Sequence, residues 1–246
     1  MLCPLLIVAL IHCMSTSMCH CYDPEESFIR NHSLLEKFIF EKNDYDKRLI
    51  PKMTSKAVDV FMDVRIRSVL DVDEKNQILI TTTSFRLRWE DFRLKWNPKD
   101  FGGISLIKLD PTRIWRPDLL IQNEVSDIPA LLRTRDTSTM INIFNTGSVS
   151  TTALVKVVTT CNIDTALFPL DTQWCDISVG SWAYPYAYMN LQWFKRNVSD
   201  DSKYDTSEWS LKEVIMKKVN IYEDPSGTYP TLVVQILLTR KMSFTA

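Results

Sequence analysis

The strict alternation of apolar and polar or charged residues after position 57 constrains the fold of this chain more than any other feature. Residues 58–67 are predicted to form a β-strand with one apolar and one mainly polar face, because a period of two places successive side chains on opposite sides of a strand. A second run, 84–89, repeats the alternation, and the polar turn 71–77 lies between them. The first run alternates Val58, Val60, Met62, Val64 and Ile66 with Asp59, Phe61, Asp63, Arg65 and Arg67, and the second alternates Phe85, Leu87 and Trp89 with Ser84, Arg86 and Arg88.

Further β-rich runs follow, and one helical pattern precedes them. Residues 24–40 read as a helix, with Phe28, Leu34, Leu35 and Phe38 roughly on one face. Many short strands behind a single helix predict an all-β fold, an antiparallel sandwich in one domain. The further strand-like runs are 139–144, 153–160, 174–182, 188–194, 210–221 and 231–240.

The N-terminus has the pattern of a secretory leader. An apolar run, 4–11, has the length of a signal-peptide core, and the small residues Ser15 and Ser17 offer cleavage sites. A short membrane anchor is the alternative, but the run is too short to span a bilayer. We therefore expect residues 1–20 to be a signal peptide and residues 21–246 to form the mature domain.

The cysteines and the glycosylation sequons are both consistent with passage through the secretory pathway. Four of the six cysteines lie within the first 21 residues, which leaves Cys161 and Cys175 as the internal pair. In an oxidising compartment these two should form a disulfide. Asn31 and Asn197 each begin a glycosylation sequon.

Several function classes lose support from what the chain lacks. The three histidines, at 12, 20 and 32, all precede the predicted strands, which disfavours histidine-based catalysis and histidine-rich metal sites in the sandwich. Five scattered glycines form no phosphate-binding loop. Paired carboxylates could serve a glycosidase, but here they lie in turns or on strand faces, where solvation explains them. With a net charge of −1, we expect no enzyme, no cofactor, no metal site and no nucleic-acid partner.

The segment between Cys161 and Cys175 holds thirteen residues and an apolar tip. Closing a ring of about 15 residues stabilises a fold by roughly 3 kcal/mol in the chain-entropy model. One interpretation is that the disulfide only cross-links two strands. The residues 167–170, Leu-Phe-Pro-Leu, are more apolar than a solvent loop needs, so we expect the tip to contact a partner, with a membrane-side partner as one candidate.

This Cys-x13-Cys loop, with FPLD inside it, resembles the signature loop of the pentameric Cys-loop ligand-gated channels, the nicotinic and serotonin receptor group. The resemblance extends over nearly the whole mature chain. It implies a helix followed by a ten-stranded immunoglobulin-like sandwich, a pentamer, and a small-molecule ligand bound between subunits. The segments that carry it, in order, are 71–98, 114–124 (IWRPDLLIQNE), 180–186 (GSWAYPY), 207–214 and 237–241.

The resemblance also assigns a principal binding face. Trp182 matches the family's central tryptophan, whose ring attracts organic cations. Tyr229 and Tyr222 match the tyrosines of the capping loop, and Gln122 stands where a tyrosine is frequent. Taken on their residue types alone, Trp182 would be a core tryptophan and the tyrosines ordinary hairpin residues.

A complementary face follows in the same way. Ser84 stands where the neighbouring subunit often offers a tryptophan, and Ser150 and Thr152 hold inward-looking positions of the next strand. The cage is therefore more polar than usual. We favour an amine ligand that need not be a quaternary ammonium. Residues 223–227 lack the adjacent cysteines of acetylcholine-binding α subunits.

Residues expected to couple binding to gating lie near the disulfide. Glu74 and Arg240 resemble the family's coupling ion pair, with Phe168, Pro169 and Asp171 in the loop itself. As an exposed pair, Glu74 and Arg240 would contribute only about 0–1 kcal/mol. Asp118 is expected to hold its own segment through hydrogen bonds.

Three functions remain open on the sequence. The first is the extracellular domain of a channel subunit at the plasma membrane, whose partners are other subunits and, in a longer chain, its own transmembrane domain. The second is a soluble secreted binding protein like the molluscan acetylcholine-binding proteins, and the third is an adhesive or structural sandwich. The apolar loop tip and the retained Glu74–Arg240 pair favour the first.

Overall fold

The computed structural model describes residues 24–125, 140–194, 206, 208–223 and 227–241, so the predicted signal peptide lies outside the described part. A helix precedes ten strands. In order these are α2 (Pro24–Lys37), the π-helical turn η1 (Phe38–Lys42), β1 (Val58–Asp73), β2 (Ile78–Glu90), the 3-10 turns η2 (Phe92–Leu94) and η3 (Pro98–Phe101), β3 (Leu106–Leu109), the 3-10 turn η4 (Pro111–Arg113), β4 (Leu119–Ile121), β5 (Ile141–Phe144), β6 (Ser148–Thr160), β7 (Thr172–Ser181), β8 (Met189–Trp193), β9 (Trp209–Glu223) and β10 (Gly227–Arg240).

Two sheets make up the sandwich. The larger has the order β3-β5-β6-β2-β1-β8, and the smaller has the order β4-β7-β10-β9. Every pairing is antiparallel except that of β1 with β8, which is parallel. The predicted all-β sandwich behind one helix is therefore confirmed. Strands β3 and β4, of four and three residues, were not predicted.

The core lies between the sheets and follows the predicted alternation. The apolar set of β1, from Val58 to Ile66, is at most 8% exposed at every position, and Phe85, Leu87 and Trp89 of β2 are at most 1% exposed. The alternate residues of both strands therefore face away from the core. This outward face of the larger sheet is where the predicted complementary residues lie.

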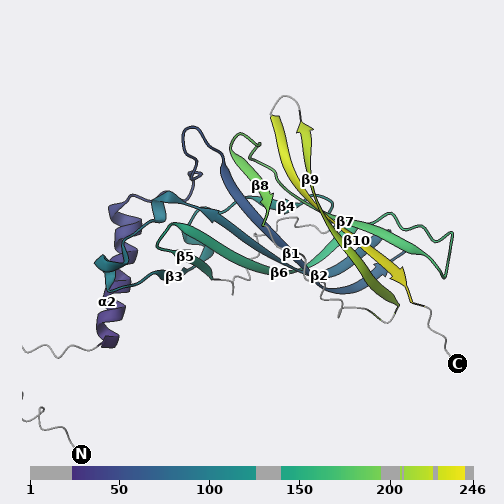
Figure 1. The fold of residues 1–246 in the computed structure, drawn as a ribbon, viewed down its shortest axis with the longest axis horizontal. Helices are drawn as coiled ribbons and strands as arrows, with labels where there is room; N and C mark the ends of the chain where they lie inside the picture. The colour runs from purple at the N-terminus through teal and green to yellow at the C-terminus, as the bar shows by residue number, and fades with distance from the viewer. Residues whose placement is uncertain (1–23, 126–139, 195–205, 207, 224–226, 242–246) are drawn as a thin grey trace, which may run out of the picture.

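Helix α2 covers one end of the sandwich and not a sheet face (Figure 1). Leu35 is fully buried, and Phe38 packs against Phe101 with ring centroids 5.3 Å apart. The apolar face of the helix is only partly buried, because Phe28 is 56% and Leu34 47% exposed. Because α2 covers only one end of the sandwich, it meets no surface that could bury all of its apolar residues.

A buried polar cluster ties the segment after α2 to the larger sheet. The Tyr45 hydroxyl donates to Asp91 Oδ2 (2.8 Å) and accepts from the Trp115 backbone N–H (3.0 Å). Asp91 is fully buried and accepts two hydrogen bonds from the Arg93 guanidinium (2.9 and 2.7 Å). Burial, together with the negative charge of Asp91, raises the pKa of Tyr45.

The long axis of the molecule separates two regions that matter below. Helix α2 lies at one end, and the loop between β6 and β7 lies at the other, beside the end of β10 (Figure 1). Strands β1, β2 and β6 extend along this axis, and β10 ends on the side of the disulfide loop (Figure 1).

Candidate functional site

Trp182 lies just after β7, in a backbone segment that Asp118 holds in place. The Ser181 hydroxyl donates to Asp118 Oδ1 (2.6 Å), and the Ala183 N–H donates to Asp118 Oδ2 (2.7 Å). The indole itself is 79% exposed. Trp182 is therefore not a core tryptophan. Asp118 was expected to hold its own segment, whereas the hydrogen bonds that the structure shows hold the Trp182 segment. A large ring fixed at its backbone and open to solvent is suited to a binding surface.

The residues after Trp182 connect this segment to β10. Tyr184 packs beside the buried Trp115, with ring centroids 6.3 Å apart, and the Tyr186 N–H donates to the Thr228 carbonyl (2.8 Å). The register pairs Thr231 with Gly180. Tyr229 lies two residues before Thr231 along β10 and is only 9% exposed.

Two further predicted residues of this face differ in how far the structure describes them. The backbone of Tyr222 pairs with Thr228 in the β9–β10 hairpin, while its side chain is outside the described part. Gln122 is exposed, and its N–H donates to the Ser178 carbonyl (2.8 Å). Its side-chain amide lies on Gly180, where a Cβ would come within 2.6 Å of Nε2.

Sequence reasoning missed two other aromatic residues near Trp182. Tyr186 is 50% and Tyr188 48% exposed. The Lys218 ammonium lies 5.6 Å from the centroid of the Tyr186 ring. The dense aromatic spacing of residues 182–188 was the available signal.

The predicted complementary residues divide into two groups. The prediction of inward-looking positions for Ser150 and Thr152 of β6 was wrong, because both lie on the outward face of the larger sheet, where they line a cavity of about 250 Å³. Ser84 does not line it, because it is 6% exposed between its neighbours Arg65 and Leu154. The other lining residues, which were not predicted, are Phe61, Asp63, Arg86, Arg88, Asn142 and Phe194.

The aromatic face and the cavity belong to different sheets of the chain. Trp182 follows β7 of the smaller sheet, while the cavity is built on β1, β2, β5 and β6 of the larger one. Within the described ranges, no hydrogen bond, ion pair or ring contact joins Trp182 or Tyr229 to the cavity residues.

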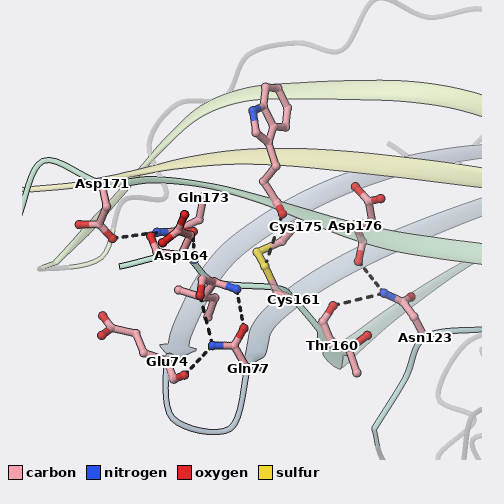
Figure 2. The surroundings of a disulfide bond; sticks show 12 residues. Glu74, Gln77, Asn123, Thr160, Cys161, Asp164, Asp171, Gln173, Cys175 and Asp176 are labelled. Atoms are coloured by element: carbon pink, nitrogen blue, oxygen red, sulfur yellow. Dashed lines mark hydrogen bonds between the residues drawn. A yellow bond between two sulfur atoms is a disulfide. The ribbon is translucent and has the colours of Figure 1, made fainter. Parts of the chain in front are cut away.

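The predicted disulfide is present and links the two sheets. Cys161 follows β6 of the larger sheet and Cys175 lies in β7 of the smaller one, with Cα atoms 5.0 Å apart. The Ile163 N–H donates to Gln77 Oε1 (2.6 Å), and Asn123 Nδ2 donates to the Asp176 carbonyl (2.8 Å). Figure 2 shows these bonds around the sulfur atoms. The base of the loop is therefore fixed to the β1–β2 turn and to both sheets.

The tip of the loop is apolar and open. Leu167 is 74%, Phe168 64% and Leu170 66% exposed, and the Phe168–Pro169 peptide bond is cis. A rigid base that presents three large apolar side chains to solvent marks a contact surface for another molecule or domain.

Arg240, the last residue of β10, joins the coupling residues predicted from the sequence. Its Nε donates to Asp171 Oδ1 (2.7 Å) and its Nη2 donates to Asp171 Oδ2 (3.0 Å) and to Glu74 Oε1. The guanidinium also lies 4.9 Å from the Phe168 ring centroid and 4.3 Å from that of Trp209. One cation thus contacts the loop, the β1–β2 turn and the first residue of β9.

Asp171 is the buried member of this cluster. Its side chain is 1% exposed, whereas that of Glu74 is 38% exposed. Gln173 Nε2 donates a third hydrogen bond to Asp171, to Oδ2 (2.8 Å). The hydrogen bonds from Arg240, together with that from Gln173, lower the pKa of Asp171, and the two carboxylates raise the pKa of Arg240.

Comparison with known proteins agrees with this geometry. Residues 32–242 match the model of the neurotransmitter-gated ion-channel ligand binding domain. The chain is 32% identical to the human neuronal acetylcholine receptor subunit alpha-2 over 177 residues, which are 72% of the chain and 32% of that protein. It is 30% identical over 216 residues to human subunit beta-3, covering 87% of the chain and 45% of beta-3, and 28% identical over 215 residues to human subunit alpha-5, covering 87% and 44%.

The matched region is a part of those relatives. The chain spans between about a third and a half of their length. In the ranges that the structure describes, no helix is both long and apolar enough to cross a membrane. The matched family and relatives are receptor proteins and not enzymes, in agreement with the expectation from the sequence.

Proposed function

Because the chain belongs to the neurotransmitter-gated ion-channel ligand-binding domain family, we propose that it is the extracellular domain of a pentameric channel subunit. It binds a small ligand between subunits, at the outer face of the plasma membrane, and transmits binding to a membrane domain. Its partners are other subunits and the transmembrane part of its own full-length chain.

The observation that carries the proposal is the apolar loop tip held by Arg240. The tip exposes Leu167, Phe168 and Leu170. Such an apolar surface is not expected on a soluble domain that has no partner for it. Arg240 connects it to β10, the strand that leaves the domain, and β10 pairs with β7, which carries Trp182 at its end. Movement at the Trp182 face therefore has a direct route to the tip.

The ligand site that we propose has a principal and a complementary face. Trp182, Tyr229, Tyr222 and Gln122 form the first, and Ser150 and Thr152, with Ser84 beside them, form the second. The exposure of Trp182 supports the assignment, because a cation–π contact requires an accessible ring face. A heterologous contact around a five-fold ring brings the first face of one subunit against the second face of the next.

The test joins residues 1–241 to the membrane helices of a nicotinic relative and records ligand-evoked currents. Trp182→Ala should abolish the current, while the amount of surface protein stays unchanged because the ring is exposed. Trp182→Phe, which keeps an aromatic face, should restore part of it. Ala187→Ser, at an exposed position of the same segment, is the matched control.

The soluble alternative makes the opposite prediction for the loop. In a soluble binding protein, changing Leu167 and Leu170 to Ser would leave every function intact. In a channel subunit, the same double change should leave ligand binding unaltered and remove the current. Loss of current through impaired binding alone would overturn the coupling role.

We also propose that residues 1–20 are a cleaved signal peptide, that 21–246 form the mature domain, and that Asn31 and Asn197 are glycosylated. Asn197 lies outside the described residues. The Asn31 amide faces Gly102, where an added Cβ would come within 2.3 Å of Nδ2, so a glycan there requires the side chain to turn outward. Mass spectrometry of the secreted protein, before and after deglycosylation, tests all three.

A further inference from the structure

The two sheets are joined along one side of the sandwich, where an edge strand of each lies beside the other. Strand β8 ends the larger sheet, and β9 ends the smaller one. The Trp193 indole N–H donates to the Lys217 carbonyl (3.1 Å). The Lys218 ammonium donates to Asn190 Oδ1 (2.9 Å). Because β9 is also the first arm of the β9–β10 hairpin, these hydrogen bonds act on the base of that hairpin.

The register explains why Lys218, and not its neighbour, reaches across with its side chain. Residues that pair directly across two antiparallel strands lie on one face of the sheet, and successive residues alternate between faces. Lys218 pairs with Leu232, which is fully buried in the core. Lys217 pairs with Val233, on the opposite face. The Lys218 side chain therefore leaves the smaller sheet toward the larger one, and it stays exposed because β9 is an edge strand.

A carboxylate orients the amide that accepts from Lys218. Asn190 Nδ2 donates to Asp59 Oδ1 (2.8 Å), which leaves the amide oxygen to face the ammonium. Gln192 Nε2 donates to the same carboxylate oxygen (2.8 Å), and the Lys56 ammonium lies 2.8 Å from Asp59 Oδ2. Side chains thus connect β1 through β8 to β9. Hydrogen bonds in series polarise one another, so each bond in this connection strengthens the next.

The same ammonium contacts the segment that carries Trp182. It lies 5.6 Å from the centroid of the Tyr186 ring, within the range of a cation–π contact. The Tyr186 N–H donates to the Thr228 carbonyl of β10 (2.8 Å). Both arms of the hairpin are therefore attached to this segment, β10 through a backbone hydrogen bond and β9 through Lys218.

We propose that Lys218 positions the β9–β10 hairpin, because one ammonium holds its first arm both to Asn190 and to the Tyr186 ring. The consequence for ligand binding rests on the proposed function, in which the hairpin supplies Tyr222 and Tyr229. A hairpin that is already held in place loses less conformational freedom when a ligand binds. Removal of the cation should therefore weaken ligand binding, although Lys218 itself need not touch the ligand.

The first experiment examines the hairpin without any ligand. Hydrogen exchange, followed by mass spectrometry, compares the secreted chain with Lys218→Met, which keeps the length of the side chain and removes its charge and donors. Lys217→Met is the matched control, because it removes the same charge from the oppositely directed neighbour and keeps the carbonyl that Trp193 contacts. Lys218→Arg keeps a cation that donates hydrogen bonds, so it is the rescue variant.

The backbone amides of residues 214–219 should exchange roughly 2- to 10-fold faster in Lys218→Met, the factor that corresponds to one lost hydrogen bond. Lys217→Met and Lys218→Arg should exchange as the wild type does. Asn190→Ala should accelerate the same amides, and adding it to Lys218→Met should accelerate them no further, because both changes remove one interaction. Equal exchange in Lys218→Met and Lys217→Met would overturn the inference.

The second experiment records currents evoked by acetylcholine and by tyramine, a quaternary and a primary amine, in the chimeric channel described above. Lys218→Met should raise the half-maximal concentration by roughly 2- to 10-fold at an unchanged amount of surface protein, and Lys218→Arg should restore it. Faster exchange with an unchanged half-maximal concentration would overturn the positioning role in ligand binding. A wild-type chimera that neither amine opens would count against the proposed function, while hydrogen exchange would still decide whether Lys218 holds the hairpin.

Discussion

Asp171→Asn should destabilise the domain far more than Glu74→Gln, although both remove one carboxylate partner of Arg240. Asp171 is 1% exposed and accepts two hydrogen bonds from the Arg240 guanidinium, whereas Glu74 is 38% exposed and accepts one. The asparagine keeps the size of the side chain and removes its charge. Arg240, 10% exposed, then retains only the outer partner.

The magnitude follows from burial. Hydrogen bonds to charged groups contribute about 1.5–3 kcal/mol each, and breaking a buried ion pair costs about 3–5 kcal/mol. Glu74 still neutralises part of the charge of Arg240, so we expect a loss of about 2–4 kcal/mol in the free energy of unfolding. Glu74→Gln should cost about 0–1 kcal/mol, the range for an exposed pair.

The assay is urea unfolding of the secreted chain, followed by tryptophan fluorescence. The transition midpoint should fall for Asp171→Asn with little change in slope, because the area exposed on unfolding is the same. Equal losses for the two variants, or a loss below about 0.5 kcal/mol for Asp171→Asn, the scale of an ordinary surface substitution, would refute the reasoning.

The pH dependence gives an independent check. Hydrogen bonds from Arg240 lower the pKa of Asp171 in the folded state, so the unfolded chain binds its proton first as pH falls. The stabilisation is fully present above the unfolded value of about 3.9 and is lost as pH falls through the folded value. The stability difference between wild type and Asp171→Asn should therefore shrink below about pH 4.

Three further predictions concern other parts of the molecule. Trp182→Ala should change the unfolding free energy by no more than about 0.5 kcal/mol, because the ring is exposed, and a larger loss by urea unfolding would make Trp182 a structural residue. Tyr45→Phe removes the hydroxyl shared by Asp91 and the Trp115 N–H, and it should lower stability by about 1–3 kcal/mol in the same assay; no change would mean that water replaces the hydroxyl. Replacing both Cys161 and Cys175 by Ala should cost about 2–4 kcal/mol, measured by thermal unfolding, unless the Gln77 and Asn123 bonds hold the loop without the disulfide.

The strands that sequence reasoning found are those with a clear period of two. β1 and β2 present their predicted apolar sets to the core without exception. β3 and β4 were missed because four or three residues carry too little of the pattern. The start of β6 was placed late, since its first five residues, Ser148–Thr152, include one strongly apolar side chain, Val149. For α2 the helical period was found, but the exposure of Phe28 and Leu34 was not visible in it, because the docking position of a helix is a tertiary property.

The candidate site was predicted unevenly for similar reasons. A local signature identified Trp182 and the cysteine pair, and the structure shows the disulfide and an exposed Trp182. Arg86 and Arg88 were visible only as the outward half of a strand. Their meeting with Ser150 and Thr152 depends on the register of β2 with β6, which no local pattern reveals. Asp171 was identified from the loop, but its burial beneath Arg240 requires the fold.

The central claim, a ligand site shared between two subunits, is tested most directly by mixing two inactive variants in the chimeric channel. Trp182→Ala removes the first face, and Thr152→Trp, at an exposed strand position, fills the second. When both variants are expressed together in equal amounts, about a quarter of the interfaces should combine two intact faces, because each interface takes one face from each neighbour. Ligand-evoked current should therefore reappear in the mixture. If both variants reach the cell surface and the mixture stays silent, the two faces do not form a shared site.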